Sequence, residues 1–412
     1  MRENEATMDL PGPLEGIKVV EYGVFHAGPG ATAILGDLGA EVIKIEASPG
    51  DPVRHWTSIG AVTFALGNGE SFMNEISNRN KKGISLNIKE EKGRRAFERL
   101  VSQADVFLTN LRKSTKDRMR LDYRSIAEIN PRIIYAGVSG YGPEGALADV
   151  GAFDPLGLAR SGMMFITGSD QPRLLHLGVL DQATAIAASH AIITALFTRE
   201  RRGYGQEVHV SLYSTAIWLI YADLMMNNAL SIDPTTSGER NKHSPLRNVF
   251  LCRDGKWLIG THHPESKYWP SLCRATGRTD LIADPRFADD QARQANCREL
   301  VAIFDQVFAA RTRDEWMEVL ISHGLMYSPV QTIPEVQSDP QALVNGYITP
   351  FDHPLLGRFM VPGYPIHFSR NRAGHRGSAP DLGQHTHEIL REIGYTDEEI
   401  EELEQAGAAP SA

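Results

Sequence analysis

The sequence predicts an α/β protein, with a doubly wound, Rossmann-like parallel sheet in a large domain and a second, smaller α+β domain. Two observations support this class. Apolar runs of strand length alternate with stretches of helix length between residues 17 and 142. The 412 residues, 42% of them hydrophobic, also exceed the usual size of one domain and can bury substantial cores.

The opening segment, residues 13–54, contains the first half of the predicted sheet. Residues 17–22 form an apolar run typical of a buried strand, and a loop of small residues follows. Leu35 and Leu38 then mark a helix, before a second strand at 41–45. In such a sheet we expect the ligand where the loops leave the carboxyl ends of the strands.

The alternation continues for three more strands with helices between them. Strands are predicted at residues 83–88, 105–110 and 132–142. The alanine-rich segment 182–199 is predicted to be a helix that is buried on much of its circumference. A glycine-punctuated turn and a strand within 201–218, and the apolar helix after them, close the first large unit.

The domain boundaries are predicted from changes in residue composition and hydrophobic pattern along the chain. We expect an N-terminal tail at 1–12, the first part of the large domain at 13–225, the small α+β domain at 226–335, a return to the large domain at 336–400, and a C-terminal tail at 401–412. The small domain includes a predicted hairpin at 249–263, whose turn is Arg253-Asp254-Gly255.

The composition excludes several classes of protein. Acidic residues outnumber basic ones, 51 against 42, so no broad basic surface is available for nucleic acid. The three cysteines are too few and too widely spaced for a disulfide framework or a CxxC zinc site. The N-terminus lacks the features of a secretory signal, and no apolar run reaches about 18 residues. We therefore expect a cytoplasmic protein without a membrane segment.

The glycine loop after the first strand has two interpretations. Gly28, Gly30 and Ala33 match a GxGxxA dinucleotide motif, with Glu46 in the place of the ribose-binding acid. In that motif, however, the first glycine follows the strand almost directly, whereas residues 23–27 intervene here. A role of the glycines in close packing is therefore favoured over nicotinamide binding.

The sequences of residues 13–54 and 382–400, the latter LGQHTHEILREIGYTDEEI, resemble those of the class III CoA-transferases. This family includes formyl-CoA, 2-hydroxyacyl-CoA and carnitine-CoA transferases. The resemblance extends over roughly residues 13–400. It implies an interlocked homodimer with the small domain inserted between two parts of the large one. It also implies that coenzyme A and acyl-CoA are substrates, with no permanently bound cofactor and no metal.

The resemblance places the catalytic nucleophile at Asp181, in LHLGVLDQATA. Relatives often have glycine before this aspartate, where this chain has Leu180. Without the resemblance, Asp181 would be interpreted as the N-cap of the helix at 182–199. The two interpretations are compatible, because a helix N-terminus favours an ionised carboxylate at neutral pH. In the implied chemistry, Asp181 forms an anhydride with the acyl group and then a thioester with CoA.

The same resemblance implies which side chains surround the ligands. Coenzyme A contacts are expected at Arg54, Asn80, Lys81, Asn110, Leu111, Arg118 and Met119. His26 and Tyr141 are expected near the substrate. Taken singly, such cations are more often solvated surface charges. No metal site is expected, because the adjacent pair His262 and His263 has no ligand spacing.

Two other functions remain alternatives. The α-methylacyl-CoA racemases belong to the same superfamily and need a histidine before the aspartate that corresponds to Asp154, but this chain has Phe153 there. Phenylalanine carries no exchangeable proton, which favours a transferase over a racemase. A non-catalytic CoA-binding protein would be expected to have lost the nucleophile, whereas Asp181 is present.

Overall fold

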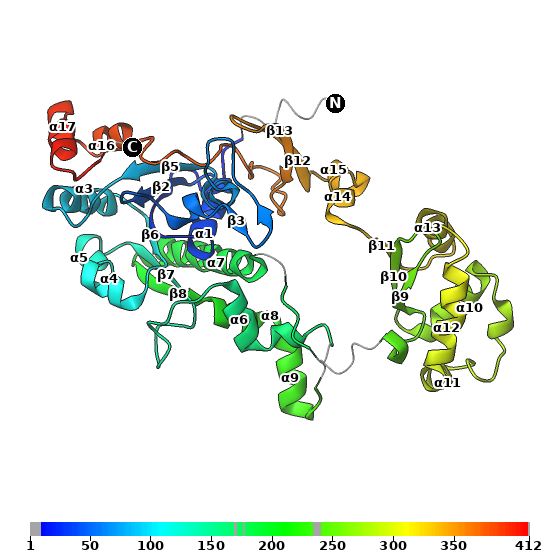
Figure 1. The fold of residues 1–412 in the computed structure, drawn as a ribbon. Coiled ribbons are helices and arrows are strands. Elements are labelled where there is room, and N and C mark those ends of the chain that lie inside the picture. Colours follow the sequence, from blue (N-terminus) through cyan, green and yellow to red (C-terminus); the bar gives the residue numbers. More distant parts are fainter. Residues whose placement is uncertain (1–9, 169–170, 176–177, 234–239, 411–412) are drawn as a thin grey trace. The chain divides into compact units, whose positions relative to one another are not determined.

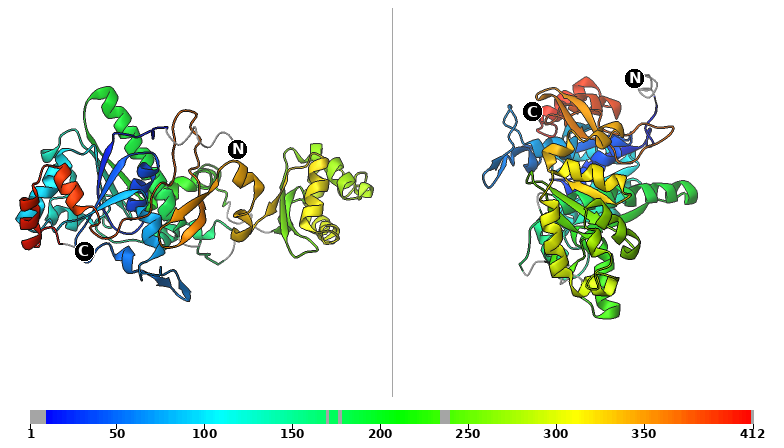
Figure 2. Two further views of the ribbon diagram at one scale, coloured as in Figure 1. Left: turned by 90° about the horizontal axis from the view of Figure 1, so that it is seen from above. Right: turned by 90° about the vertical axis from the view of Figure 1, so that its right-hand side faces the viewer.

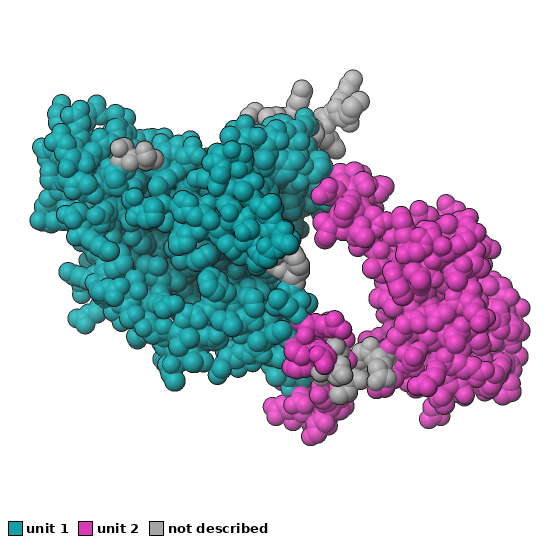
Figure 3. All heavy atoms as spheres, in the orientation of Figure 1, with its two compact units in different colours: residues 1–164, 174–224, 345–412 teal, residues 165–173, 225–344 magenta. Residues whose placement is uncertain are grey.

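The computed structural model describes residues 10–168, 171–175, 178–233 and 240–410. The chain divides into two compact units (Figure 3). Unit 1 comprises residues 1–164, 174–224 and 345–412, and unit 2 comprises 165–173 and 225–344. The chain returns to unit 1 at residue 345, where the sequence suggested 336. Residues 1–9 of the expected N-terminal tail lie outside the described residues.

Unit 1 is built on a six-stranded sheet in the order β5-β2-β1-β6-β7-β8 (Figure 1). The strands are β1 (Lys18–Tyr22), β2 (Glu41–Glu46), β5 (Lys81–Ser85), β6 (Val106–Thr109), β7 (Ile134–Ser139) and β8 (Gln206–Ser211). All neighbouring strands are parallel. The predicted α/β class is therefore confirmed. The strand order reverses between β1 and β6, which is where a doubly wound sheet binds its ligand.

Helices cover both faces of this sheet (Figures 1 and 2). On one face, α1 (Ala27–Asp37) and α7 (Val179–Arg202) pack against the strands through a core that includes Val19, Leu35 and Ile192. The other face contains a second core around Phe97 and Phe107. This core is covered by α3 (Glu91–Ser102), α5 (Tyr123–Ile129), α16 (Thr386–Glu392) and α17 (Asp397–Gln405). The alternation of Val19 and Val20 between the two cores shows the period of two expected of a strand.

Helix α7 is long and apolar enough to cross a membrane by length and composition alone. In the structure it is a core helix of unit 1, because Leu180, Ala188 and Ile192 are at most 1% exposed. It begins at Val179, three residues before the predicted start, and ends at Gly203 in the left-handed conformation. The extra N-terminal turn brings residue 181 inside the helix.

The remaining elements of unit 1 are short. They are β3 (Ser58–Ile59), β4 (Val62–Thr63), α2 (Phe72–Asn78), α4 (Lys113–Met119), α6 (Asp154–Ser161), α8 (Leu212–Leu219), β12 (Ile348–His353) and β13 (Gly357–Pro362). The expectation of a C-terminal tail from residue 401 is wrong, because α17 continues to Gln405 and Ala408 and Ala409 are fully buried. Their amides bond to the carbonyl oxygen of Leu403, which ends the helix inside the core. Residues 411–412 lie outside the described residues.

Unit 2 contains a three-stranded antiparallel sheet covered by helices. The strands are β9 (Arg247–Leu251), β10 (Trp257–Thr261) and β11 (Tyr327–Val330), and the helices assigned to this part of the chain include α10 (Glu265–Ala275), α11 (Asp290–Ala295), α12 (Cys297–Phe308), α13 (Arg313–Ser322), α14 (Ile333–Val336) and α15 (Pro340–Val344). Helix α9 (Tyr221–Leu230) spans the boundary between the units. The predicted hairpin is present as β9 and β10, with Gly255 at a φ of 75° in its turn. The aromatic core includes Phe250, Phe304 and Phe308.

Candidate active site

A large cavity lies in unit 1, at the carboxyl ends of β1, β6 and β7. Its volume is about 910 Å³. The wall is formed by residues 24–27 after β1, 110–113 after β6, the segment that follows β7, and Asp181 at the start of α7. The cavity therefore occupies the point where the strand order reverses, and its size suits a cofactor-sized ligand.

Asp181 lies in the first turn of α7, and it is not the N-cap that the sequence suggested. The capping role belongs to Asp154 in the first turn of α6. One of its carboxylate oxygens accepts the backbone N–H of Leu180 at 2.6 Å and of Asp181 at 3.1 Å. Asp154 thus satisfies two amides that a helix start leaves without partners. Among the described residues, no donor or cation contacts the carboxyl group of Asp181 itself.

Burial dominates the electrostatics of Asp181. Loss of water and, second, the neighbouring charge of Asp154 together raise its pKa to about 7. Burial and Asp154 therefore outweigh the helix N-terminus, which was expected to favour the ionised form of Asp181. Near pH 7 the group is divided between acid and carboxylate, so its reactive form is available without a large protonation change.

Two side chains hold His26 beside the first turn of α7. Its Nε2 lies 2.8 Å from Oε1 of Gln182, and its Nδ1 lies 2.9 Å from Oγ of Ser77. Because a carbonyl oxygen only accepts, Nε2 donates its proton to Gln182 and Nδ1 accepts from the hydroxyl of Ser77. Burial lowers the pKa of His26 to about 4, so the ring is neutral. His26 lines the cavity as predicted, but both nitrogens are already bonded.

Two cations expected at coenzyme A are buried in ion pairs instead. Arg54 donates from Nε and Nη2 to the two carboxylate oxygens of Glu46, at 2.8 and 2.7 Å, and is 1% exposed. Lys81 donates to Glu21 at 2.6 Å, to the carbonyl of Pro29 at 2.8 Å and to Asn78 at 2.9 Å. The three N–H groups of Lys81 are all used, and Arg54 uses four of its five, because it also bonds to Glu70 and to the carbonyl of Pro380. We therefore assign both side chains to the scaffold.

The other predicted contacts fall into two groups. Asn110 and Leu111 line the cavity, and the amide of Asn110 exchanges hydrogen bonds of 2.9 and 2.7 Å with the backbone of Val24. Asn110 thus joins the loops that follow β1 and β6. Arg118, Met119 and Tyr141 are not part of the cavity wall. The ring of Tyr141 lies against Arg160 instead, with the guanidinium carbon 5.8 Å from its centroid.

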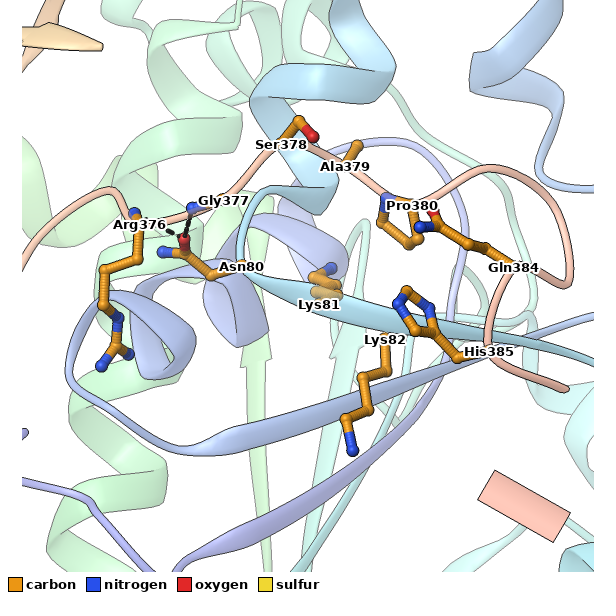
Figure 4. Close-up of a pocket in the computed structure, with 10 residues that line it drawn as sticks. All are labelled: Asn80, Lys81, Lys82, Arg376, Gly377, Ser378, Ala379, Pro380, Gln384 and His385. Carbon is orange, nitrogen blue, oxygen red and sulfur yellow. Dashed lines mark hydrogen bonds between the residues drawn. The ribbon is translucent and has the colours of Figure 1, made fainter. Parts of the chain in front are cut away.

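Asn80 lies at a separate, more open pocket of about 370 Å³ (Figure 4). Its side-chain oxygen accepts the backbone N–H groups of Arg376 and Gly377 at 2.7 and 2.8 Å. Lys82 at this pocket is paired with three carboxylates, those of Glu41, Glu388 and Glu392. Asn80 therefore fastens the C-terminal segment to β5.

Four cations on the cavity wall were not singled out as ligands by the sequence. They are Arg112, Lys113, Lys116 and Arg124, on α4, α5 and the loops around them. Their position at the end of β6 is the signal that could have identified them, because this is the strand next to the reversal of strand order. Among the described residues, no group of histidine, cysteine and acidic side chains could hold a metal ion.

A parallel sheet with a ligand-sized cavity at its switch point is typical of α/β proteins that bind nucleotide-like cofactors. The sequence profile of CoA-transferase family III matches residues 14–386, and the chain belongs to that family. An acyl-CoA transferase from Fusarium pseudograminearum is 34% identical over 403 residues, which cover 96% of this chain and 88% of that protein. The human succinyl-CoA:glutarate CoA-transferase is 32% identical over 409 residues, with coverage of 98% and 91%.

Solved structures of the family have the same fold. A CAIB/BAIF family protein from Brucella suis superposes with a TM-score of 0.82 at 29% identity, covering 93% of this chain and all of that one. The Rv3272 protein from Mycobacterium tuberculosis superposes with a TM-score of 0.77 at 28% identity, covering 92% of this chain and 99% of that one. These matches extend over both units and confirm the fold that the sequence predicted.

Proposed function

We propose that this protein is an enzyme that transfers coenzyme A from an acyl-CoA donor to a free carboxylic acid, with Asp181 as the nucleophile. The observation that carries this proposal is a partly buried carboxyl group that has no counter-charge among the described residues, on the wall of a cavity of about 910 Å³. A carboxylate freed of water and of hydrogen bonds is a stronger nucleophile than a solvated one. The family and its relatives support the same reaction.

The proposed reaction conserves the energy of the thioester through covalent steps. The carboxylate of Asp181 attacks the thioester carbon, the C–S bond breaks, CoA leaves as a thiolate, and an acyl-aspartyl anhydride remains on the enzyme. The thiolate then attacks the aspartyl carbon, which releases the donor acid and forms an aspartyl-CoA thioester. The carboxylate of the acceptor acid displaces CoA from that thioester and forms a second anhydride with Asp181. The thiolate finally attacks the acceptor's carbonyl carbon, which gives the new acyl-CoA and releases the carboxylate of Asp181. Water must stay out, because it would hydrolyse each intermediate.

The cations on the cavity wall supply the proposed site for the phosphates of coenzyme A. Arg112, Lys113, Lys116 and Arg124 all reach this wall. Arginine and lysine bind phosphate oxygens through charge-assisted hydrogen bonds. Asn110 fixes the two loops between these cations and Asp181, so it positions the site without contacting a phosphate.

A racemase is less well supported than a transferase. It needs a second acid or base across the α-carbon of the substrate. Phe153 occupies the position of the racemase histidine and reaches the cavity wall. His26 is on the same wall, but its nitrogens are bonded to Gln182 and Ser77.

We also propose that the protein forms a homodimer. The family resemblance implies that its two chains are interlocked. Large apolar side chains of unit 1 are left in solvent on the helices that follow β8. Trp218 is 72% exposed and Leu219 is 50% exposed. A second copy of the chain would remove this apolar surface from water.

Trapping with hydroxylamine tests the assignment of Asp181. The protein is incubated with an acyl-CoA and hydroxylamine, which converts an activated aspartyl group to a hydroxamate that is located by peptide mass. We expect the modification at Asp181, and we expect CoA exchange to vanish in Asp181→Asn while Asp352→Asn, a change of an exposed carboxylate on β12, retains it. Exchange that persists in Asp181→Asn would overturn the mechanism.

A further inference from the structure

The surroundings of Asp181 form a closed ring of contacts. Asp154 accepts the N–H of Asp181, and the next residue, Gln182, contacts His26 at 2.8 Å. Phe25 precedes His26, and its ring meets that of Phe153 edge-on with centroids 5.1 Å apart. Phe153 in turn precedes Asp154. The two aromatic rings are therefore tied to the nucleophile through neighbours on both sides.

This part of the cavity wall is apolar and open. Val150, Phe153 and Leu156 line the cavity and are 47%, 58% and 47% exposed, although they are large hydrophobic side chains. Behind Phe25, Trp56 lies edge-on with a centroid distance of 6.3 Å and fixes the ring from the other side. Exposed apolar side chains next to a reactive group are typical of a surface that binds an apolar ligand.

We propose that this wall is the acyl subsite, and that it selects monocarboxylic acids with an aryl or branched alkyl chain over dicarboxylic acids. The inference rests on the proposed CoA transfer and names its substrate class. An acid chain placed against Phe153 and Phe25 would bury apolar surface and meet an aromatic edge or face. The acid's own carboxylate would remain at Asp181, where the reaction occurs.

A dicarboxylic acid would need a partner for its second charge in this subsite. Among the described residues of the ring, His26 has both nitrogens bonded and Asp154 is itself an acid. Arg112 approaches this wall, because a side chain at Gly151 would meet its Nη2 at 2.6 Å. Arg112 belongs to the cluster that we assign to the phosphates. An unpaired carboxylate against the phenylalanines would be costly to desolvate.

Self-exchange separates this inference from the proposed function. Each CoA thioester is incubated with its own acid carrying a ¹³C label, and incorporation of the label into the thioester is followed by mass. The acids are 3-phenylpropanoate, 4-methylpentanoate, glutarate and propanoate. We expect kcat/KM for the first two to exceed that for glutarate by at least about tenfold, as apolar contacts of this size provide.

Two variants test the role of Phe153. Phe153→Ala should lower kcat/KM for 3-phenylpropanoate by about tenfold or more and for propanoate by less than about twofold, while Phe153→Leu should restore most of the value for 4-methylpentanoate. The matched control is Phe197→Ala, which removes a similarly exposed ring on α7. Phe197 lies about 24 Å from Asp181 along the axis of this helix. The control should change none of these values.

The outcomes distinguish the two claims. If no acid exchanges in the unmodified protein, the proposed function fails. If glutarate exchanges best, or if Phe153→Ala lowers all four acids equally, CoA transfer stands and the subsite assignment is overturned. A change in oligomeric state in Phe153→Ala, with the preference among acids unchanged, would instead assign this apolar wall to a second copy of the chain and would also overturn it.

Discussion

Glu21 and Asp181, two carboxylates of unit 1 near the carboxyl ends of the sheet, differ in their burial and in their neighbours: Glu21 is fully buried and Asp181 is partly buried. Glu21, on β1, is inaccessible to solvent and bonds to the ammonium groups of Lys44 at 2.8 Å and Lys81 at 2.6 Å. Asp51 adds a second carboxylate, 3.0 Å from Lys44. Asp181, on α7, has no cation beside it among the described residues and has Asp154 as its nearest charge.

The difference shows that counter-charge decides what a buried carboxylate does. Burial raises the pKa of both groups, but Lys44 and Lys81 overcome this effect at Glu21 and hold its pKa at about 2. At Asp181 nothing opposes burial, and the pKa is about 7. Glu21 is thus a permanent charge within the scaffold, whereas Asp181 is a group with an accessible protonation change and a lone pair to offer.

The largest contrast is expected in stability. Glu21→Gln leaves two buried lysines with one remaining carboxylate, so we expect the free energy of unfolding to fall by about 3–5 kcal/mol. Asp181→Asn removes a charge that is not compensated, and we expect a change of less than about 1 kcal/mol or a gain. Denaturant unfolding of both variants measures the difference. Equal losses would show that the two carboxylates have the same structural role.

The response of stability to pH should have opposite signs at the two sites. The folded protein binds the proton of Asp181 more tightly than the unfolded chain does, because the pKa rises from 3.8 to about 7. Its contribution therefore makes stability fall as pH rises between these values, by at most about 1.4 kcal/mol per pH unit. Glu21, with its pKa lowered from 4.5 to about 2, makes stability fall as pH decreases through that window.

Unfolding curves from pH 4 to 7 check the sign. The difference between Asp181→Asn and the unmodified protein should grow in favour of the variant as pH rises. A difference that is constant over this range would mean that Asp181 titrates in the folded protein as it does in the unfolded chain.

The sequence predicted the sheet better than it predicted the surroundings of the cations, and Asp181 as the nucleophile stays a prediction. Strand and helix periods depend on local alternation of apolar residues, which the printed sequence contains directly. Asp181 was implied by a family resemblance, and the structure adds its burial and its missing partner. The sequence alone could not show that Arg54 and Lys81 are paired, because the loop after β2 has to turn Arg54 back onto Glu46 and because Glu21 lies 60 residues before Lys81.

One signal of this pairing was available. Glu21 interrupts the apolar strand KVVEY, and a charge within a buried strand requires a counter-charge nearby. By contrast, the acyl subsite combines residues 25, 153 and 181 from three separate loops and helices, and no periodicity connects them. The homodimer stays a prediction from the family resemblance.

Two arginines near α4 can be compared in the same way as the two carboxylates. Arg112, the N-cap residue of α4, lies on the cavity wall, whereas Arg118, within α4, does not. We expect Arg112→Ala to raise KM for acyl-CoA about tenfold with kcat nearly unchanged, because a phosphate contact is made equally in the ground state and the transition state. Arg118→Ala is the matched control and should leave KM unchanged. A larger KM effect at Arg118 would return the phosphate site to the position implied by sequence.

The smallest expected effect concerns Asp154, the like charge beside Asp181. Asp154→Asn keeps an oxygen that accepts the amides of Leu180 and Asp181 but removes the negative charge that raises the pKa of Asp181. Only the carboxylate form attacks, so log kcat/KM should rise with pH up to the pKa, and the variant should shift this acid limb to lower pH by less than one unit. Asp117→Asn removes another carboxylate of the cavity wall and should cause no shift. An acid limb that stays in place in Asp154→Asn would mean that burial alone sets the pKa of the nucleophile.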